Sequence, residues 1–460
     1  MVQKIPVVDG DRGPTRAPDR EQRVVALEER LVELLGAGAV SAEPRVRQRA
    51  SVDGAIMSPI LAARLPLPLA DLVAFPEDAV SLARAVAAAV RLRVPVTVRG
   101  KGTGNYGQAL PLRQGLVLDT TRARAITEVG DGFLTAEAGT PMVLMERAAW
   151  AAGQQLQMYP STVHSTIAGF LGGGKGGTGS VAHGFNDRGF VRALDVVHAD
   201  GSDEIVHVTA PETLPYVHTY GTTGVIVRAT VALEPLQQWR AVYASFPDLP
   251  SAAAVLRPLC DVEPAPRLVS CDNPAVSAAF PEDTAMPAGR ASLRVVVDAA
   301  TLDGVVALVE GGGGRIEDVR EGLNAVLHAS TLSYNHAVEW VQKRSTVPLF
   351  HVEVGGPALP EKCAAVESVY PGGMLHLEGT RSRPNGLLVA PFRSERDVRE
   401  GYESLAALGI GHHDAHQWMV DTRVDEAIAT AARTDPQGLL NPGRLPVETR
   451  PGGRGAAGRG

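Results

Sequence analysis

The chain has 460 residues, of which 45% are hydrophobic and 21% are charged, as in ordinary globular proteins. Its 44 Lys and Arg against 51 Asp and Glu give a formal charge of −7, which argues against a nucleic-acid partner. Three cysteines are too few for a disulfide framework, and no apolar stretch reaches the ~18 residues that a membrane helix needs. The N-terminus lacks the apolar core of a secretory signal, so we expect a cytoplasmic protein without a membrane partner.

The first half of the chain has a regular alternation of predicted helices and strands. Residues 1–20 and 447–460 are rich in Gly, Pro and charge and are predicted as disordered tails. Leucines at helical spacing predict a helix over 21–35, and residues 70–235 then alternate short strands with helices. The strands are expected at 72–75, 94–98, 116–119, 134–138, 193–198 and 204–209, and the helices after Pro76 and over 141–152. We assign residues 21–236 to a first domain.

The pattern becomes looser after Pro235 but stays mixed. Strands are expected at 241–246, 293–297, 350–354 and 386–391, and helices at 248–259, 301–310, 336–343 and 395–408. We assign 237–423 to a second domain and 424–446 to a segment that returns to the first. The fold class is therefore α+β with two domains. The shortness of the strands argues against a fully buried parallel sheet.

Two segments of the first domain are unusually rich in glycine. Four of the nine residues over 99–107 are glycine, and eight of the sixteen over 169–184. Glycine at such density is costly in a helix or strand, but it allows backbone N–H groups to approach an anion closely. One lysine lies in each segment, at Lys101 and Lys175. Two such loops in one domain favour a phosphate-binding site over plain flexible connections.

Two common phosphate-binding motifs do not fit these loops. Gly102, Gly104 and Gly107 satisfy G-x-G-x-x-G, but the residues that follow do not form the helix that a dinucleotide fingerprint requires. Residues 169–175 match the start of a nucleoside-triphosphate loop, yet Gly176 stands where a Mg²⁺-binding hydroxyl is needed.

Four segments in order resemble a family of flavoproteins. They are Val98–Gly104, residues 160–179 continued by 193–201, Gly221–Ile226, and Asp435–Gly443, which reads DPQGLLNPG. They resemble the FAD-linked oxidases of the vanillyl-alcohol oxidase and p-cresol methylhydroxylase (PCMH) type, especially the glycolate-oxidase-like branch. The resemblance implies a PCMH-type FAD-binding domain over 21–236, with a substrate or cap domain over 237–423.

The same resemblance implies which residues hold FAD. The first loop would wrap the pyrophosphate and part of the flavin, the second would hold the ribityl and phosphate portions, and two backbone groups would meet the adenine. These residues are Arg99, Gly100, Lys101, Gly102, Thr103, Gly104, Asn105 and Tyr106; Ser161, Thr166, Gly169, Gly173, Gly174, Lys175 and Gly176; Val225 and Ile226; and Asn441 in the terminal loop. Relatives with covalent flavin carry a histidine at the position of Thr103, so we expect non-covalent FAD.

Candidate catalytic residues lie outside these loops. Residues 411–418 read GHHDAHQW, and His416 is the best single candidate for a base because it resembles a segment of the glycolate-oxidase-like branch. His413 and His416 are also possible metal ligands, but no third ligand is positioned as in a known motif, so no metal is predicted. A polar strand at the domain junction is the plainer interpretation.

A second cluster is Tyr334-Asn335-His336, which resembles an Asn-His pair of some relatives. The plain alternative is that Asn335 caps the following helix and His336 lies in its first turn. Arg381 and Arg383 are candidates for a clamp on a substrate carboxylate, although surface arginines are abundant in this chain.

The resemblance implies oxidation of a small-molecule alcohol or 2-hydroxy acid by hydride transfer to flavin N5, with a histidine taking the hydroxyl proton. The sequence does not indicate the substrate, the electron acceptor or the oligomeric state. Two alternatives stay open: an NAD(P)H-dependent flavin reductase that acts on an unsaturated substrate, and a nucleotide- or flavin-binding protein without catalysis.

Overall fold

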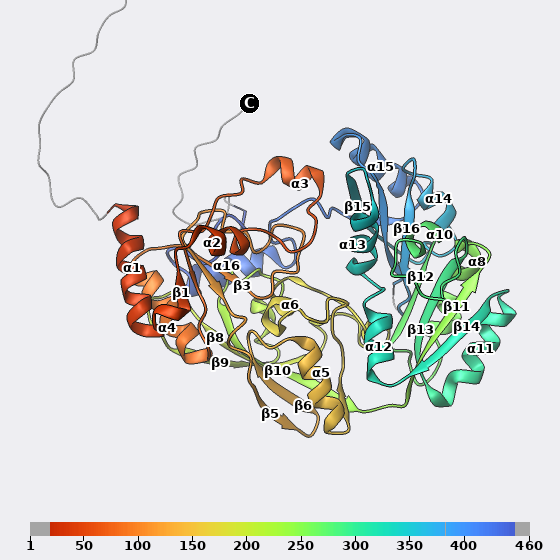
Figure 1. Ribbon diagram of the computed structural model, residues 1–460, viewed down its shortest axis with the longest axis horizontal. Helices are drawn as coiled ribbons and strands as arrows, with labels where there is room; N and C mark the ends of the chain where they lie inside the picture. The colour runs from red at the N-terminus through yellow and green to blue at the C-terminus, as the bar shows by residue number, and fades with distance from the viewer. Residues whose placement is uncertain (1–18, 382, 447–460) are drawn as a thin grey trace, which may run out of the picture.

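The computed structural model describes residues 19–381 and 383–446, which form two lobes (Figure 1). The first lobe contains two sheets and the second contains one, and helices pack on all three. The predicted α+β class is confirmed. The predicted tails lie outside the described residues, except for Asp19 and Arg20. Asp19 caps the first helix and Arg20 begins it.

The first sheet of the first lobe has four strands in the order β1-β2-β4-β3. They are β1 (Val40–Ser41), β2 (Leu72–Ala74), β4 (Leu116–Asp119) and β3 (Val96–Arg99). Contrary to expectation, β2, β4 and β3 run parallel and are almost wholly buried. Helices α1 and α4 cover one face and Ala50 and Ala70 pack on the other, so even strands of three or four residues bury both faces.

The second sheet of the first lobe is antiparallel and is built around the long strand β10. Its order is β5-β6-β10-β8-β9, and β7 also pairs with β10. The strands are β5 (Ile126–Gly130), β6 (Phe133–Glu137), β7 (Gln154–Leu156), β8 (Val191–Val197), β9 (Ile205–Thr209) and β10 (Val225–Pro235). The β8–β9 pair ends at Val197 and Ile205, and the connection between them contains Asp200 and Gly201.

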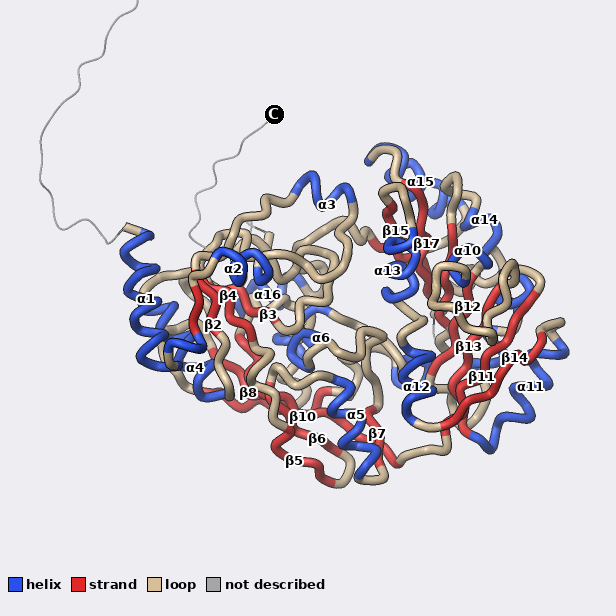
Figure 2. The backbone as a smooth tube through the Cα atoms, in the orientation of Figure 1, coloured by secondary structure: helices blue, strands red, loops and turns tan. Residues whose placement is uncertain are grey.

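The helices of the first lobe cover these sheets and frame the glycine-rich loops. They are α1 (Arg20–Leu35), α2 (Pro44–Ala50), α3 (Pro59–Arg64), α4 (Ala79–Arg91), α5 (Met142–Ala151), α6 (Ile167–Gly173) and α7 (Ser180–His183), with 3-10 turns at Ala37–Ala39 and Leu214–Tyr216. Long loops surround α6 (tan in Figure 2).

The second lobe is one sheet of eight strands in the order β14-β11-β13-β12-β16-β17-β15-β18. The strands are β11 (Trp239–Phe246), β12 (Leu268–Asp272), β13 (Ala291–Asp298), β14 (Arg315–Glu321), β15 (Leu349–Gly355), β16 (Met374–Glu378), β17 (Asn385–Pro391) and β18 (Gly411–His413). Every neighbouring pair is antiparallel.

Helices cover both faces of the eight-stranded sheet. The outer face packs against α8 (Leu249–Ala254), α9 (Leu256–Cys260), α11 (Leu302–Gly311), α14 (Cys363–Glu367) and α15 (Glu395–Ala407). The inner face, which carries Leu268, Val296 and Leu387, packs against α10 (Pro274–Ser277), α12 (Leu323–Ser330) and α13 (Asn335–Arg344). A 3-10 turn at Ala299–Thr301 precedes α11.

The end of the described chain returns to the first lobe, as Figure 1 shows for α16 (Val424–Thr434). Thr434 Oγ1 donates to the carbonyl of Thr223 at 2.6 Å, and Asn441 N–H donates to the carbonyl of Val96 at 2.7 Å. The return segment therefore fastens directly to β3 and to the loop before β10. Among the residues described, no helix is long and apolar enough to cross a bilayer.

Candidate active site

The two glycine-rich loops lie against each other. A Cβ on Gly100 would lie 2.0 Å from Thr166 Oγ1, so only glycine permits this approach. Thr103 Oγ1 lies 2.7 Å from Ser165 Oγ, and this hydrogen bond links the first loop to the segment that leads into the second. Gly54 N–H donates to the carbonyl of Gly102 at 2.7 Å, which fixes the first loop from its other side. The loops are therefore held in place by specific contacts.

The second glycine-rich loop combines a position that faces open space, Gly172, with a closely packed position, Gly177. A Cβ on Gly172 would meet no atom within 4 Å, although this residue lies in α6. A Cβ on Gly177 would lie only 2.0 Å from the carbonyl oxygen of Tyr159. The first position faces open space and the second faces protein.

A cavity of about 730 Å³ extends from these loops to the inner face of the second sheet. Eighteen of the predicted site residues line it: Gly100, Lys101, Gly102, Thr103, Gly104, Asn105, Tyr106, Ser161, Thr166, Gly169, Gly173, Gly174, Lys175, Gly176, Val225, Ile226, Tyr334 and Asn335. The structure thus brings together segments from both halves of the chain in one space.

Two predicted cofactor-binding residues lie behind the cavity wall. Asn441 Nδ2 donates to the carbonyls of Gln108 at 2.8 Å and Tyr220 at 2.9 Å, and both of these residues line the cavity. Arg99 is buried beneath the first loop, and burial lowers its pKa. Both residues position the loops from behind.

Three predicted catalytic residues do not line the cavity. Arg381 donates to the carbonyls of Cys260 at 2.9 Å and Val262 at 2.8 Å, so its guanidinium serves the backbone of α9 and the turn after it. Its expected place in a carboxylate clamp is therefore corrected. His336 lies in the first turn of α13, where burial lowers its pKa.

His416, the preferred base candidate, is buried one layer behind the cavity. Its Nδ1 lies 2.8 Å from Ser58 Oγ, and its ring contacts the ring of His351 edge to face. His351 Nε2 in turn lies 2.8 Å from the hydroxyl of Tyr106, which lines the cavity. Burial lowers the pKa of His416 to about 4. These placements do not support direct contact between His416 and a substrate.

Polar residues form two rows on the inner face, because directly paired residues of antiparallel strands share one face. The register aligns Asp272, His376, Leu387, Glu353 and His413 across β12, β16, β17, β15 and β18 in one row. It aligns Ser270, Glu378, Asn385, Gly355 and Gly411 in the other. Seven of these ten residues line the cavity: Glu353, Gly355, Glu378, Asn385, Leu387, Gly411 and His413.

His413 lies between two carboxylates. Its Nε2 makes a short contact with Asp421 Oδ2, and its Nδ1 lies 3.2 Å from Glu353 Oε2. These partners raise the pKa of His413 to about 10, so the ring is an imidazolium at neutral pH. Burial would raise the pKa of Asp421, but the hydrogen bond with His413 and the charge of Lys175 lower it to about 2.

Tyr106 joins the first glycine-rich loop to this cluster. Its hydroxyl lies 2.8 Å from His351 Nε2 and 3.2 Å from Glu353 Oε1. Burial, together with the charge of Glu353, raises the pKa of Tyr106 well above its usual value, so the phenol stays protonated. It is positioned to donate or accept a hydrogen bond at the cavity wall.

Arg383 lies beside the second-sheet wall of the cavity and has no ion pair with an acidic side chain among the described residues. It is exposed, and its guanidinium passes over Gly355 and Gly411, where a Cβ on Gly411 would lie 2.4 Å from Nη2. Its side chain lines the cavity. The two glycines thus make room for an unpaired guanidinium beside Asn385.

Glu353 and Glu378, which were not among the candidates predicted from the sequence, line the cavity from the same sheet. A signal for both exists in the segments 351–353 and 376–378, which each read His-x-Glu. In a strand this spacing places both side chains on the same face. No group of three or more His, Cys, Asp or Glu suited to a metal occurs in 19–381 or 383–446.

Comparisons with known proteins agree with this geometry. A family model described as "FAD binding domain" matches residues 70–208. The chain is 30% identical over 170 residues to a D-lactate dehydrogenase of Archaeoglobus fulgidus, covering 35% of this chain and 38% of that enzyme. It is 29% identical over 194 residues to the glycolate oxidase subunit GlcD of Bacillus subtilis, covering 40% and 41% respectively. The matched regions thus span less than half the length of these curated relatives.

The whole fold has a counterpart among solved structures. An alkyldihydroxyacetonephosphate synthase superposes with a TM-score of 0.74 over 94% of this chain and 88% of the synthase chain, at 13% identity. At that identity the likeness concerns the fold alone. Residues 70–208 match an FAD-binding domain, which confirms the predicted resemblance to FAD-linked oxidases and FAD as the cofactor.

The cavity fits that cofactor. Gly100, Gly102, Gly172 and Gly173 line its wall, and a Cβ on Gly172 would meet no atom within 4 Å. The volume of about 730 Å³ is within the range of ligand-binding cavities. Lys101 and Lys175 supply positive charge near the loops for a pyrophosphate. These two loops would hold FAD, with the inner face of the second sheet opposite them.

Proposed function

We propose that this chain is an FAD-dependent oxidoreductase that oxidises a small-molecule alcohol, specifically a 2-hydroxy acid. The main observation behind this proposal is that one cavity extends from the FAD loops to a wall of ionisable side chains. This wall includes the guanidinium of Arg383, which has no acidic partner among the described residues. Two matched proteins, named D-lactate dehydrogenase and glycolate oxidase subunit GlcD, support this substrate class. A cytoplasmic location and non-covalent FAD, with Thr103 bonded to Ser165, are parts of the same proposal.

Each part of the wall has a chemical task in this proposal. Arg383 binds the substrate carboxylate, because a planar guanidinium forms two parallel hydrogen bonds with that group. Asn385 and the protonated Tyr106 offer further hydrogen bonds that orient the substrate. The bound FAD supplies the chemistry of hydride acceptance. Asn335 and Tyr334 close the cavity from the start of α13.

The first measurement is an absorption spectrum of the purified protein before and after acid denaturation, followed by a panel of 2-hydroxy acids under anaerobic conditions. We expect flavin bands that pass to the supernatant on denaturation and that bleach with a hydroxy acid. Flavin that stays with the precipitate would contradict non-covalent binding. Bleaching by NAD(P)H alone would favour the reductase alternative, and no bleaching at all would leave a flavin-binding protein.

The role of Arg383 is tested by Arg383→Met. Loss of a charge-assisted hydrogen-bonded pair costs about 1.5–3 kcal/mol, so kcat/KM for the hydroxy acid should fall about 10- to 100-fold, chiefly through KM. Arg396→Met is the matched control, since Arg396 is exposed on α15, where it pairs with Glu400. An unchanged KM in Arg383→Met would remove Arg383 from substrate binding.

A further inference from the structure

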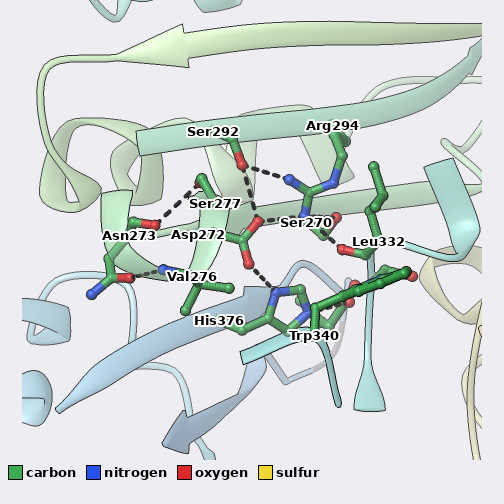
Figure 3. Close-up of polar contacts among 12 residues, drawn as sticks. Ser270, Asp272, Asn273, Val276, Ser277, Ser292, Arg294, Leu332, Trp340 and His376 are labelled. Carbon is green, nitrogen blue, oxygen red and sulfur yellow. Dashed lines mark hydrogen bonds and ion pairs between the residues drawn. The ribbon is translucent and has the colours of Figure 1, made fainter. Parts of the chain in front are cut away.

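A series of buried charged side chains lies on the inner face of the second sheet, and Figure 3 shows Arg294, Asp272 and His376 of this series. Arg294 Nη2 lies 2.5 Å from Asp272 Oδ2, and Asp272 Oδ1 lies 2.6 Å from His376 Nδ1. His376 Nε2 then lies 2.7 Å from Glu378 Oε1. None of these four side chains is more than 1% exposed. Of the four, Glu378 lines the cavity.

The two carboxylates in this series of buried charges, Asp272 and Glu378, differ in whether both of their oxygens have hydrogen-bond partners. Asp272 uses both, since Oδ2 also accepts from Ser292 Oγ at 3.0 Å. Glu378 Oε1 accepts from His376 and from the backbone N–H of Tyr334 at 2.7 Å. Glu378 Oε2 is buried and has no hydrogen-bond partner. A buried carboxylate oxygen without a partner is costly, so a donor on a bound ligand is the expected partner.

The backbone around Glu378 also indicates a constrained site. Tyr334 has a φ of 49°, a left-handed conformation that a bulky residue seldom adopts. Its N–H is directed at Glu378 Oε1, so the Glu378 carboxylate helps to hold this conformation. Tyr334 and Glu378 face the same cavity. Strain of this kind is often retained at functional sites.

Glu353, the other cavity-facing glutamate, is less suited to accept a proton. Burial would raise the pKa of Glu353, but its contact with the imidazolium of His413 outweighs that effect and lowers it. Burial raises the pKa of Glu378, and His376 offsets this only in part. A base whose pKa lies closer to neutrality accepts a proton more readily in a reaction.

We propose that Glu378 Oε2 accepts the hydrogen bond of the substrate hydroxyl and then its proton. The O–H bond breaks and its proton passes to Glu378, while the C–H hydrogen leaves with its electron pair for the bound FAD and C–O becomes C=O. His376, held between Asp272 and Glu378, is a positioning residue for this carboxylate. The inference rests on the proposed oxidation of a hydroxy acid.

The rate test uses Glu378→Gln, which keeps the shape of the side chain but cannot take the proton. We expect FAD to be retained and the rate of flavin reduction by a hydroxy acid to fall by ~100-fold or more. Glu367→Gln is the matched control, because Glu367 is a partly buried carboxylate of the same lobe that accepts a hydrogen bond from Asn273 and does not line the cavity. It should reduce at the rate of the unmodified protein.

A binding test needs no turnover. A 2-hydroxy-2-methyl acid keeps the hydroxyl but has no hydrogen on the reacting carbon, and its 2-methyl counterpart lacks the hydroxyl. By calorimetry the unmodified holoprotein should prefer the hydroxy compound, and Glu378→Leu should lose this preference by ~10-fold or more.

The outcomes separate the two proposals. If no hydroxy acid reduces the flavin of the unmodified protein, the proposed function fails and the role of Glu378 fails with it. If the unmodified protein is reduced and Glu378→Gln is reduced equally fast, only the role of Glu378 is overturned. An unchanged preference for the hydroxyl in Glu378→Leu overturns it as well.

Discussion

Two histidines of the inner face, His376 and His413, each lie between a pair of carboxylates. Burial alone would lower the pKa of His376, but Asp272 and Glu378 outweigh it and raise the pKa to about 9. The hydrogen bonds of His413 raise its pKa to about 10. Both rings are therefore cations at neutral pH. Neither can serve as the proton acceptor that histidines usually provide, which agrees with the proposed role of Glu378.

The charge of His413 has a consequence for stability against pH. Because its folded pKa lies above its unfolded value of about 6.5, its contribution is fully present below pH ~6.5 and is lost as pH rises through about 10. Asp421→Asn should lower the pKa of His413, which NMR of the imidazole ring measures. The contribution of His413 to the unfolding free energy should then be lost over a lower pH range. Asp195→Asn, which alters the exposed His207 instead, should leave the His413 titration unchanged. A His413 that titrates near pH 6.5 in the unmodified protein would refute the ion-pair cluster.

At the scale of elements, α6 and the loop after it combine an open wall with a tightly packed one. Gly172 faces open space in the cavity, and Gly177 packs on the backbone at Tyr159. Glycine is therefore needed at these two nearby positions for two different physical reasons. Gly172 keeps room for a ligand, whereas Gly177 keeps room for protein.

These two glycines should respond to alanine in opposite ways. Gly177→Ala places a Cβ 2.0 Å from a carbonyl oxygen, so unfolding free energy of the FAD-free protein should fall by about 1–3 kcal/mol or more. Gly172→Ala should keep or raise it, by up to about 1 kcal/mol, because alanine is the better helix former. Its methyl group would project into the cavity and weaken FAD binding. Denaturation and flavin-fluorescence titration measure the two effects, and equal losses of stability would contradict this distinction.

At the scale of the whole molecule, a buried ion pair joins the two lobes. Arg267, just before β12, lies 2.5 Å from Glu146 of α5, and neither side chain is more than 2% exposed. The guanidinium also donates to the carbonyl of Leu156 at 2.6 Å and stacks near the rings of Tyr159 and Trp239. This junction fixes one lobe against the other and therefore sets the shape of the cavity between them.

Removing one charge of this junction should be costly. Glu146→Gln leaves Arg267 buried without a counter-charge, which typically destabilises a protein by about 3–5 kcal/mol. Urea denaturation measures the loss, and weakened FAD binding should accompany it. Glu400→Gln breaks an exposed pair on α15 and should cost about 0–1 kcal/mol. Similar losses in both variants would show that the junction does not couple the lobes.

Much of the fold could be predicted from the sequence because local patterns carry it. The helices over 142–151 and 395–407 and the strands over 116–119 and 385–391 show their apolar spacing directly. The strands β12 and β16 were missed because they carry buried Asp, His and Glu, which in sequence look like exposed polar positions. Their polarity is explained only by partners on other strands.

The sequence by itself determined the FAD-binding domain, since glycine spacing is a backbone property that a linear pattern preserves. It also singled out Tyr334 and Asn335 as catalytic candidates; both line the cavity, and their catalytic role stays a prediction. Only the tertiary structure decided that Arg383 and not Arg381 faces the cavity, and that His416 lies behind Tyr106 and His351. The reason is physical: whether a side chain of a given type meets a carbonyl, a counter-charge or open space depends on strands paired across more than a hundred residues, and no local pattern encodes that pairing.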